Sequence, residues 1–151
     1  MARKAGWAAL LIVPALLGGC KADSRFVLFT SDIVAVAQGG DPAPVSALYR
    51  VEISSKSDCE EKKSEMMAIA SKYYDVISGA LCVENDGDTW LEYSARTELV
   101  QFGQPLAGNA PIGVAARQVQ PGDPVELYLL FDSARFAALQ RDVGELDLAA
   151  S

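Results

Sequence analysis

Residues 46–54, SALYRVEIS, alternate between hydrophobic and polar positions. A period of two is typical of a strand with one buried face. The predicted buried face comprises Ala47, Tyr49, Val51 and Ile53. Residues 26–37, FVLFTSDIVAVA, are rich in β-branched and aromatic residues and predict an earlier, long strand. Residues 38–44, which contain glycines and prolines, predict the loop between the two strands.

The period changes after residue 56. Ser57 and Glu60 have the S-x-x-E spacing of a capping box, which predicts the start of a helix. Behind it, apolar residues recur at helical spacing and predict one long amphipathic helix. Its predicted apolar stripe is Cys59, Met66, Ile69, Ala70, Tyr73, Val76 and Ile77.

The second half of the chain predicts more strands and a short helix. Residues 79–100 predict a hairpin that turns at residues 85–88, NDGD. Residues 112–119 and 125–131 predict two strands separated by a turn at Pro121 and Gly122, and Asp132 or Ser133 can cap a short helix. We expect the tail, residues 146–151, to be frayed. This order predicts an α+β fold: a mostly antiparallel sheet with the long amphipathic helix and the short C-terminal helix packed on one face.

The N-terminus has the parts of a secretory signal. Arg3 and Lys4 supply positive charge, and residues 5–17 form an uncharged apolar run. This run of 13 residues is too short to cross about 30 Å of hydrocarbon as a helix. It ends in residues 17–20, LGGC, so that two small residues precede Cys20.

Residues 17–20 resemble the lipobox of bacterial lipoproteins, which is a leucine, two small residues and a cysteine. The resemblance implies cleavage before Cys20 and acylation of the Cys20 thiol and of its new amino group. The alternatives are a membrane-anchor helix or a buried cysteine. The resulting domains are a signal peptide over 1–19, a lipid-anchored tether over 20–25 and a single α+β domain over 26–146. Because Lys21 rather than aspartate follows the cysteine, the resemblance implies the outer membrane, with the domain facing the periplasm.

Composition narrows the function. The 151 residues carry a net charge of −7, and without residues 1–19 the remaining 11 basic and 20 acidic residues give −9. Such a chain repels phosphates, so no nucleic-acid partner is expected. Histidine is absent, which removes the commonest general base and metal ligand. We therefore expect no catalytic site, no metal and no cofactor.

Cys59 and Cys82 are the only thiols left if Cys20 carries lipid. An even pair in an oxidising compartment is read as a disulfide. A helix over residues 59–75 is about 24 Å long, and an extended segment over 75–82 that runs back along it is about 23 Å long. Cys82 is therefore expected to lie beside Cys59 at the start of the helix. The alternative, a redox-active pair, has no C-x-x-C motif to support it.

The remaining expectations concern binding. Trp90 falls on the polar side of its strand and, with Tyr74, is a candidate partner contact. Alternatively, Trp90 packs against the second predicted helix, the short C-terminal one. The lipobox, the compact mature domain and the cysteine pair resemble small uncharacterised lipoproteins of proteobacteria and their prophages. The first hypothesis is a non-catalytic envelope module, held in the membrane through lipid on Cys20, that binds an envelope protein. The alternatives are a prophage lipoprotein that blocks a receptor and, least favoured, a hydrolase of envelope polymer with two carboxylates in a pocket.

Overall fold

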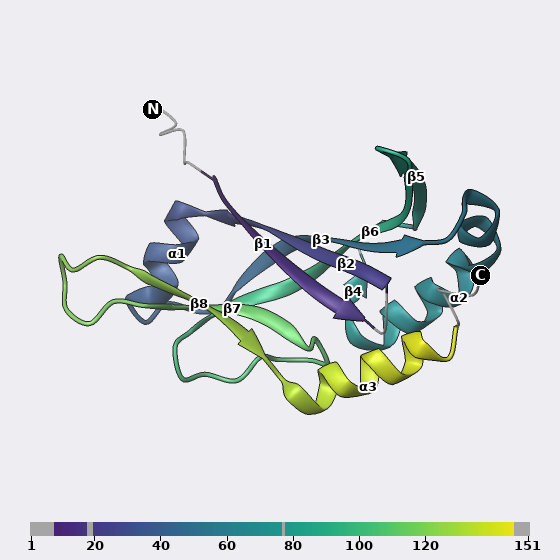
Figure 1. The fold of residues 1–151 in the computed structure, drawn as a ribbon. Helices are drawn as coiled ribbons and strands as arrows, with labels where there is room; N and C mark the ends of the chain where they lie inside the picture. The colour runs from purple at the N-terminus through teal and green to yellow at the C-terminus, as the bar shows by residue number, and fades with distance from the viewer. Residues whose placement is uncertain (1–7, 18–19, 77, 147–151) are drawn as a thin grey trace.

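A computed structural model describes residues 8–17, 20–76 and 78–146 of the chain. Its elements in chain order are β1 (Ala8–Leu17), β2 (Cys20–Phe29), α1 (Thr30–Ala37), β3 (Ala43–Ile53), α2 (Lys56–Tyr73), β4 (Asp75–Val76), β5 (Leu81–Asn85), β6 (Asp88–Gln101), β7 (Ile112–Arg117), β8 (Glu126–Phe131) and α3 (Ser133–Gly144) (Figure 1). Four expectations fall outside the described residues: the basic start of the signal, the two glycines before Cys20, Ile77, and the frayed tail beyond Leu146.

The described strands form one curled sheet in the order β1-β2-β3-β6-β7-β8. The long strand β6 organises it, because β3 pairs along one edge of β6 while β5, β4 and β7 share the other edge. Only the pairing of β6 with β7 is parallel among these ladders. The predicted α+β fold with a mostly antiparallel sheet is therefore confirmed.

One face of the sheet, which we call the inner face, packs against the helices. The alternation predicted for β3 is confirmed, because its apolar residues Ala47, Tyr49, Val51 and Ile53 are all at most 6% exposed. They share one core with buried residues of all three helices, including Ile33 of α1, Met66 of α2 and Leu139 of α3. The opposite, outer face of β2, β3 and β6 carries the alternate residues.

The prediction of a strand over residues 26–37 is wrong in its second half. The strand β2 ends at Phe29, and Thr30–Ala37 forms the helix α1. β-branched residues favoured a strand, but Ile33, Val36 and Ala37 also lie on one side of a helix, where they are buried. The apolar surface of β6 and β7, against which α1 packs, decides between the two conformations.

The long amphipathic helix is not confirmed. The helix α2 ends at Tyr73 because Tyr74 adopts an extended conformation, and Val76 belongs to the strand β4. Its buried residues are Cys59, Met66, Ile69 and Ala70. The predicted capping box is also wrong: the N-cap is Ser55, whose hydroxyl accepts a hydrogen bond from the Asp58 N–H over 3.1 Å.

The predicted tether over residues 20–25 lies inside a strand. The strand β2 begins at Cys20, and Ala22 already pairs with Val51 of β3. A segment that reads as polar linker therefore contributes backbone hydrogen bonds to the sheet.

The turns and the last helix follow the sequence closely. The strands β5 and β6 form the predicted hairpin, and its two turn residues, Asp86 and Gly87, have φ values of 53° and 88°. These left-handed conformations suit an Asp-Gly turn. The helix α3 is capped by Asp132, whose carboxylate accepts a hydrogen bond from the Arg135 N–H over 3.0 Å.

Candidate functional site

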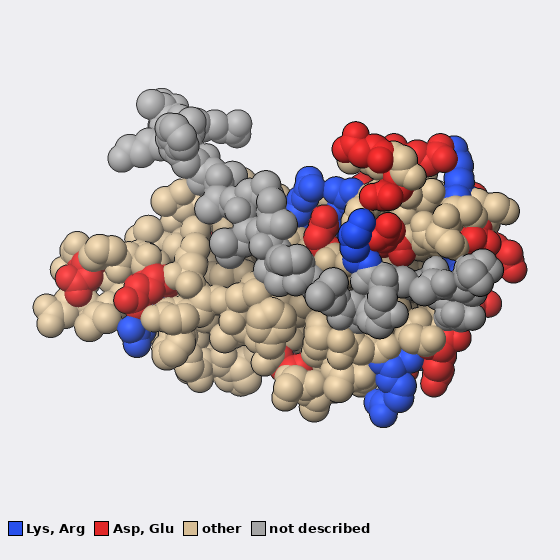
Figure 2. Space-filling model, in the orientation of Figure 1, with Lys and Arg blue, Asp and Glu red and all other residues tan. Residues whose placement is uncertain are grey.

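The outer face of β2, β3 and β6 is a candidate surface, because the three helices bury their apolar residues in the core on the other face. Acidic and basic side chains lie intermixed near the β5–β6 hairpin, whereas the opposite end of the molecule is mostly uncharged in the same view (Figure 2). Apolar side chains, Val27 and Phe29, are exposed at the far end of β2. We call the half of this face nearer the hairpin the charged half. The other half carries the exposed Val27 and Phe29 together with the exposed Arg96.

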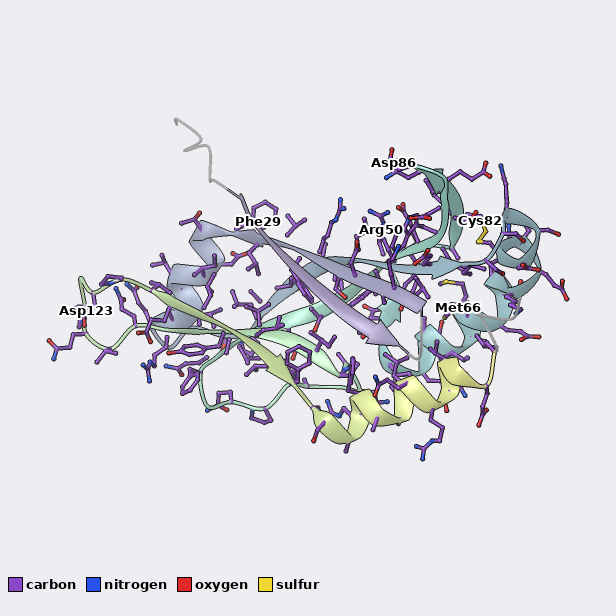
Figure 3. The ribbon with its side chains drawn as sticks, in the orientation of Figure 1. Phe29, Arg50, Met66, Cys82, Asp86 and Asp123 are labelled. Carbon is purple, nitrogen blue, oxygen red and sulfur yellow. A yellow bond between two sulfur atoms is a disulfide. The ribbon has the colours of Figure 1, made fainter. Side chains whose placement is uncertain are left out.

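Arg50 of β3 lies in the charged half, in register with Glu92 of β6 (Figure 3). Its side chain is only 9% exposed, and its guanidinium lies 3.2 Å from the Glu92 carboxylate and 3.8 Å from that of Asp23. The same guanidinium stacks on the Trp90 ring, 4.5 Å from its centre. A buried cation needs such partners, because removing them would leave an uncompensated charge. We call Asp23, Arg50, Trp90 and Glu92 the Arg50 cluster.

Lys21 extends the charged half toward the start of β2. Its ammonium lies 3.5 Å from the Glu52 carboxylate and 3.7 Å from that of Asp88. The Lys21 side chain is 63% exposed, so these ion pairs contribute little to stability. They set the charge pattern of this part of the outer face.

The structure does not bring the predicted contact residues Trp90 and Tyr74 together. Trp90 lies half-buried on the outer face, whereas Tyr74 is 6% exposed and packs on the inner face. The ring of Tyr74 lies 4.5 Å from that of Tyr49 and 6.5 Å from that of Tyr93, measured between centroids. Tyr74 is therefore a core residue, and only Trp90 remains a candidate for contact with a partner.

The three core tyrosines line a small cavity between the sheet and the helices α2 and α3. Its volume is about 40 Å³, and the other lining residues are mostly apolar. Burial raises the pKa of all three phenols well above the ordinary value, so they stay neutral. A space of this size suits one or two water molecules and not an organic substrate.

A larger hollow, of about 320 Å³, opens beside β4, β6 and residues 106–110. Two carboxylates line it, those of Asp75 and Glu98. Asp75 is 73% exposed and lies 3.7 Å from the Arg96 guanidinium, while Glu98 accepts a hydrogen bond of 2.9 Å from the Ala107 N–H. Each of these two carboxylates therefore already has a polar partner within the fold.

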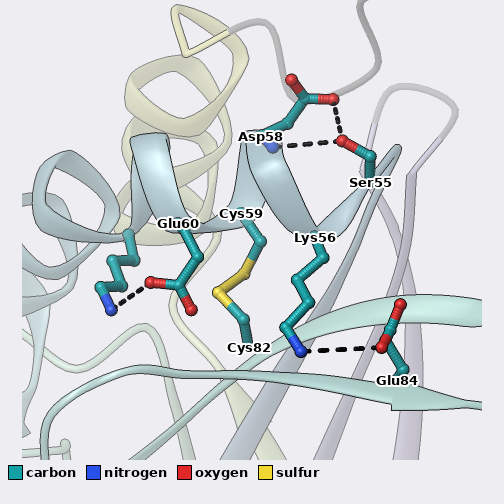
Figure 4. Close-up of a disulfide and its surroundings, with 8 residues drawn as sticks. Ser55, Lys56, Asp58, Cys59, Glu60, Cys82 and Glu84 are labelled. Carbon is teal, nitrogen blue, oxygen red and sulfur yellow. Dashed lines mark hydrogen bonds and ion pairs between the residues drawn. A yellow bond between two sulfur atoms is a disulfide. The ribbon is translucent and has the colours of Figure 1, made fainter.

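The cysteine pair is a disulfide that joins the start of α2 to β5 (Figure 4). Cys59 is fully buried, and the Cα atoms of Cys59 and Cys82 lie 6.0 Å apart. Beside it, the Lys56 ammonium lies 3.7 Å from the Glu84 carboxylate across the same two elements. The predicted pairing of these two cysteines is therefore confirmed.

Among the residues that the structure describes, no three Cys, Asp or Glu side chains are grouped as metal ligands. None of the described helices has both the length and the apolar character needed to cross a bilayer. Comparisons of the chain with models of known families, with curated proteins and with solved structures gave no match.

The Arg50 cluster is the feature that sequence reasoning missed. Alternation along β3 assigns Arg50 to the polar face, where exposure is the ordinary expectation. Its burial depends on Asp23, Trp90 and Glu92, which two other strands supply. The only hint in the sequence was an arginine and a tryptophan on the polar sides of two predicted strands.

Proposed function

We propose that this chain is a lipid-anchored protein of the bacterial cell envelope that binds a protein partner through the outer face of β2, β3 and β6. The observation that carries the proposal is the sequence LGGC at residues 17–20, behind a short apolar run with basic residues in front. Two acyl chains on Cys20 bury enough methylene groups to anchor a protein stably. The lysine after Cys20 favours the outer membrane, with the domain in the periplasm.

The short distance from the lipid to the sheet supports a domain held close to the bilayer. Only Lys21 stands between Cys20 and Ala22, the first residue that pairs with β3. Two residues reach at most about 7 Å. Such a domain meets other proteins of the same membrane more readily than distant ones.

The outer face supports the binding part of the proposal. Aromatic and arginine side chains are enriched in protein interfaces, and the Arg50 cluster supplies both from residues that are already well ordered by packing. The exposed Val27 and Phe29 add apolar area to the same face. The negative charge of the chain argues against a nucleic-acid partner.

Intact-mass analysis of the protein extracted from bacterial membranes tests the anchor. We expect the loss of residues 1–19 and the added mass of diacylglycerol and an acyl chain. Cys20→Ser should abolish both modifications. A chain that keeps its first 19 residues without lipid would refute the anchor.

Photocrosslinking in the intact envelope tests the binding surface. A photoreactive residue at Ser94, on the outer face of β6, should capture a discrete partner, whereas one at Val119, in the exposed loop between β7 and β8, should not. Trp90→Ala should weaken the capture at Ser94. Equal capture at both positions would show that the outer face is not the interface.

A second candidate, hydrolysis of envelope polymer, depends on the two carboxylates of the larger hollow. If it were the function, Glu98→Gln would abolish release of soluble fragments from purified envelope polymer, while Glu84→Gln, on β5, would not. Absence of any release by the unmodified protein would retire this candidate.

A further inference from the structure

The strand β1 pairs with the edge of β2 that faces away from β3. It pairs with β2 over ten positions, from Ala8 opposite Phe29 to Leu17 opposite Cys20. All of β1 belongs to the segment that the proposed cleavage before Cys20 removes, so the inference below rests on the proposed function. Since β1 is an edge strand of the sheet, its loss leaves the order β2-β3-β6-β7-β8 intact. It also exposes the backbone donors and acceptors of β2, which is an edge ready to pair with another strand.

The charged residues of β2 lie in register with uncharged residues of β1. Asp23 lies opposite Pro14 and Arg25 opposite Ile12, and residues 8–17 include no charged residue. The Asp23 Oδ2 atom lies 3.8 Å from the Arg50 guanidinium, but within the described part of the chain the Asp23 Oδ1 and Arg25 Nε atoms are buried and have no hydrogen-bond partner. Buried polar atoms of this kind are usually paired. The edge of β2 therefore fits a neighbouring strand that presents charged groups at these two positions.

The sequence of β2 is complementary to itself at these positions. We propose that the mature chain forms a symmetric dimer in which the β2 strands of two copies pair antiparallel about Ser24. In this register Asp23 of each copy faces Arg25 of the other, which forms two cross-strand ion pairs. Pairing about Arg25 or about Asp23 would instead place two like charges opposite each other. A register shifted by a single residue would place the inner-face residues of one copy on the same side of the joined sheet as the outer-face residues of the other copy.

The geometry of this dimer suits two lipid anchors. The two-fold axis is perpendicular to the paired strands, so both Cys20 residues lie at the same height along the axis, about 27 Å apart. Both acyl groups can therefore enter one bilayer. The helix α1 begins directly after Phe29, and in the mature chain no residue precedes Cys20 to collide with it. The dimer also joins the outer faces of two copies into one continuous surface.

Cysteine crosslinking in membranes tests the pairing and its register. In the proposed dimer, residue 21 of each copy faces residue 27 of the other, at about 5 Å between Cα atoms. Lys21 and Val27 are both exposed, with exposed fractions of 63% and 40%. The double variant Lys21→Cys/Val27→Cys, made in the full-length chain and oxidised mildly in membranes, should give a crosslinked dimer. Each single variant should give at most about a tenth as much, because two copies of the same position lie about 20 Å apart.

The pair Lys21→Cys/Phe29→Cys is the matched control for register, because these positions face each other only if the strands pair about Arg25. A stronger crosslink from this pair, equal crosslinking by the single variants, or crosslinks only to a different protein would each overturn the proposal. Arg25→Glu in the Lys21→Cys/Val27→Cys background places a carboxylate opposite Asp23 of the second copy and should reduce the dimer at least about fivefold. Arg25→Lys should retain it.

The intact mass of the same samples separates the two proposals. A chain that keeps residues 1–19 would refute the proposed function. It would also refute the dimer, because β1 would still cover the edge of β2. A chain that is cleaved and acylated but gives no dimer refutes the dimer alone. Retention of the Cys59–Cys82 disulfide and an unchanged unfolding midpoint would show that Arg25→Glu acts on pairing rather than on folding.

Discussion

Removing the disulfide should lower the stability of the folded domain by about 3 kcal/mol. Cys59 and Cys82 are 23 residues apart. In the chain-entropy model, a crosslink that closes a loop of this size lowers the entropy of the unfolded chain, which raises the free energy of unfolding by about 3 kcal/mol. With a typical urea m value of about 2 kcal/mol/M, the expected shift of the unfolding midpoint is about 1.5 M. The double variant Cys59→Ala/Cys82→Ala should show this shift without leaving a thiol in the core.

Tryptophan fluorescence during urea unfolding measures the effect. The chain has two tryptophans, and Trp90 is the one that remains after residues 1–19 are removed. Reductant added to the unmodified protein is the control, because it breaks the bond but keeps both sulfur atoms. If reductant leaves the midpoint unchanged, the two cysteines are not bonded in the native protein, and the expectation of an oxidising compartment loses its support. If only the double variant is destabilised, packing of the buried sulfur rather than loop closure is responsible.

Three further predictions concern local features. Ser55→Ala should lower the free energy of unfolding by about 1 kcal/mol through loss of the α2 cap, whereas Ser57→Ala, at the position the sequence favoured, should change it by less than about 0.5 kcal/mol in the same urea titration. Gly87→Ala should cost about 1 kcal/mol because its φ of 88° strains a side chain, while Gly79→Ala, which meets no atom within 4 Å and lacks a positive φ, should cost less than about 0.5 kcal/mol. The core tyrosines should make the fold sensitive to alkali, because burial raises their pKa in the folded state above that in the unfolded state. Their contribution to the free energy of unfolding is fully present below about pH 10 and is lost as the pH rises further. Above pH 10 the free energy of unfolding should fall by about 4 kcal/mol per pH unit, and Tyr93→Phe should reduce that slope by about a third; a slope that does not respond to Tyr93→Phe would contradict the assignment.

Local features of the fold were predictable from the sequence. The alternation of residues 46–54 identified the buried side of β3, because successive side chains of a strand point to opposite faces whatever the neighbouring strands are. Asp86 and Gly87 identified the β5–β6 turn, and the start of α3 was predicted at Asp132 or Ser133, of which Asp132 is the N-cap. Each of these features depends on interactions within a few residues of the chain.

The candidate site was decided by tertiary structure. The burial of Arg50 needs Asp23 from β2 and Glu92 from β6, and no local pattern says that these strands are the neighbours of β3. The sequence also could not show that Trp90 lies on the outer face while Tyr74 is buried. The burial of Tyr74 follows from its position just after the end of α2, where the chain enters the core. Residues 30–37 form a helix because of the surface they meet on β6 and β7. The period and the turns follow from local backbone geometry, whereas strand order, and therefore which charges meet, is set by contacts between residues far apart in the chain.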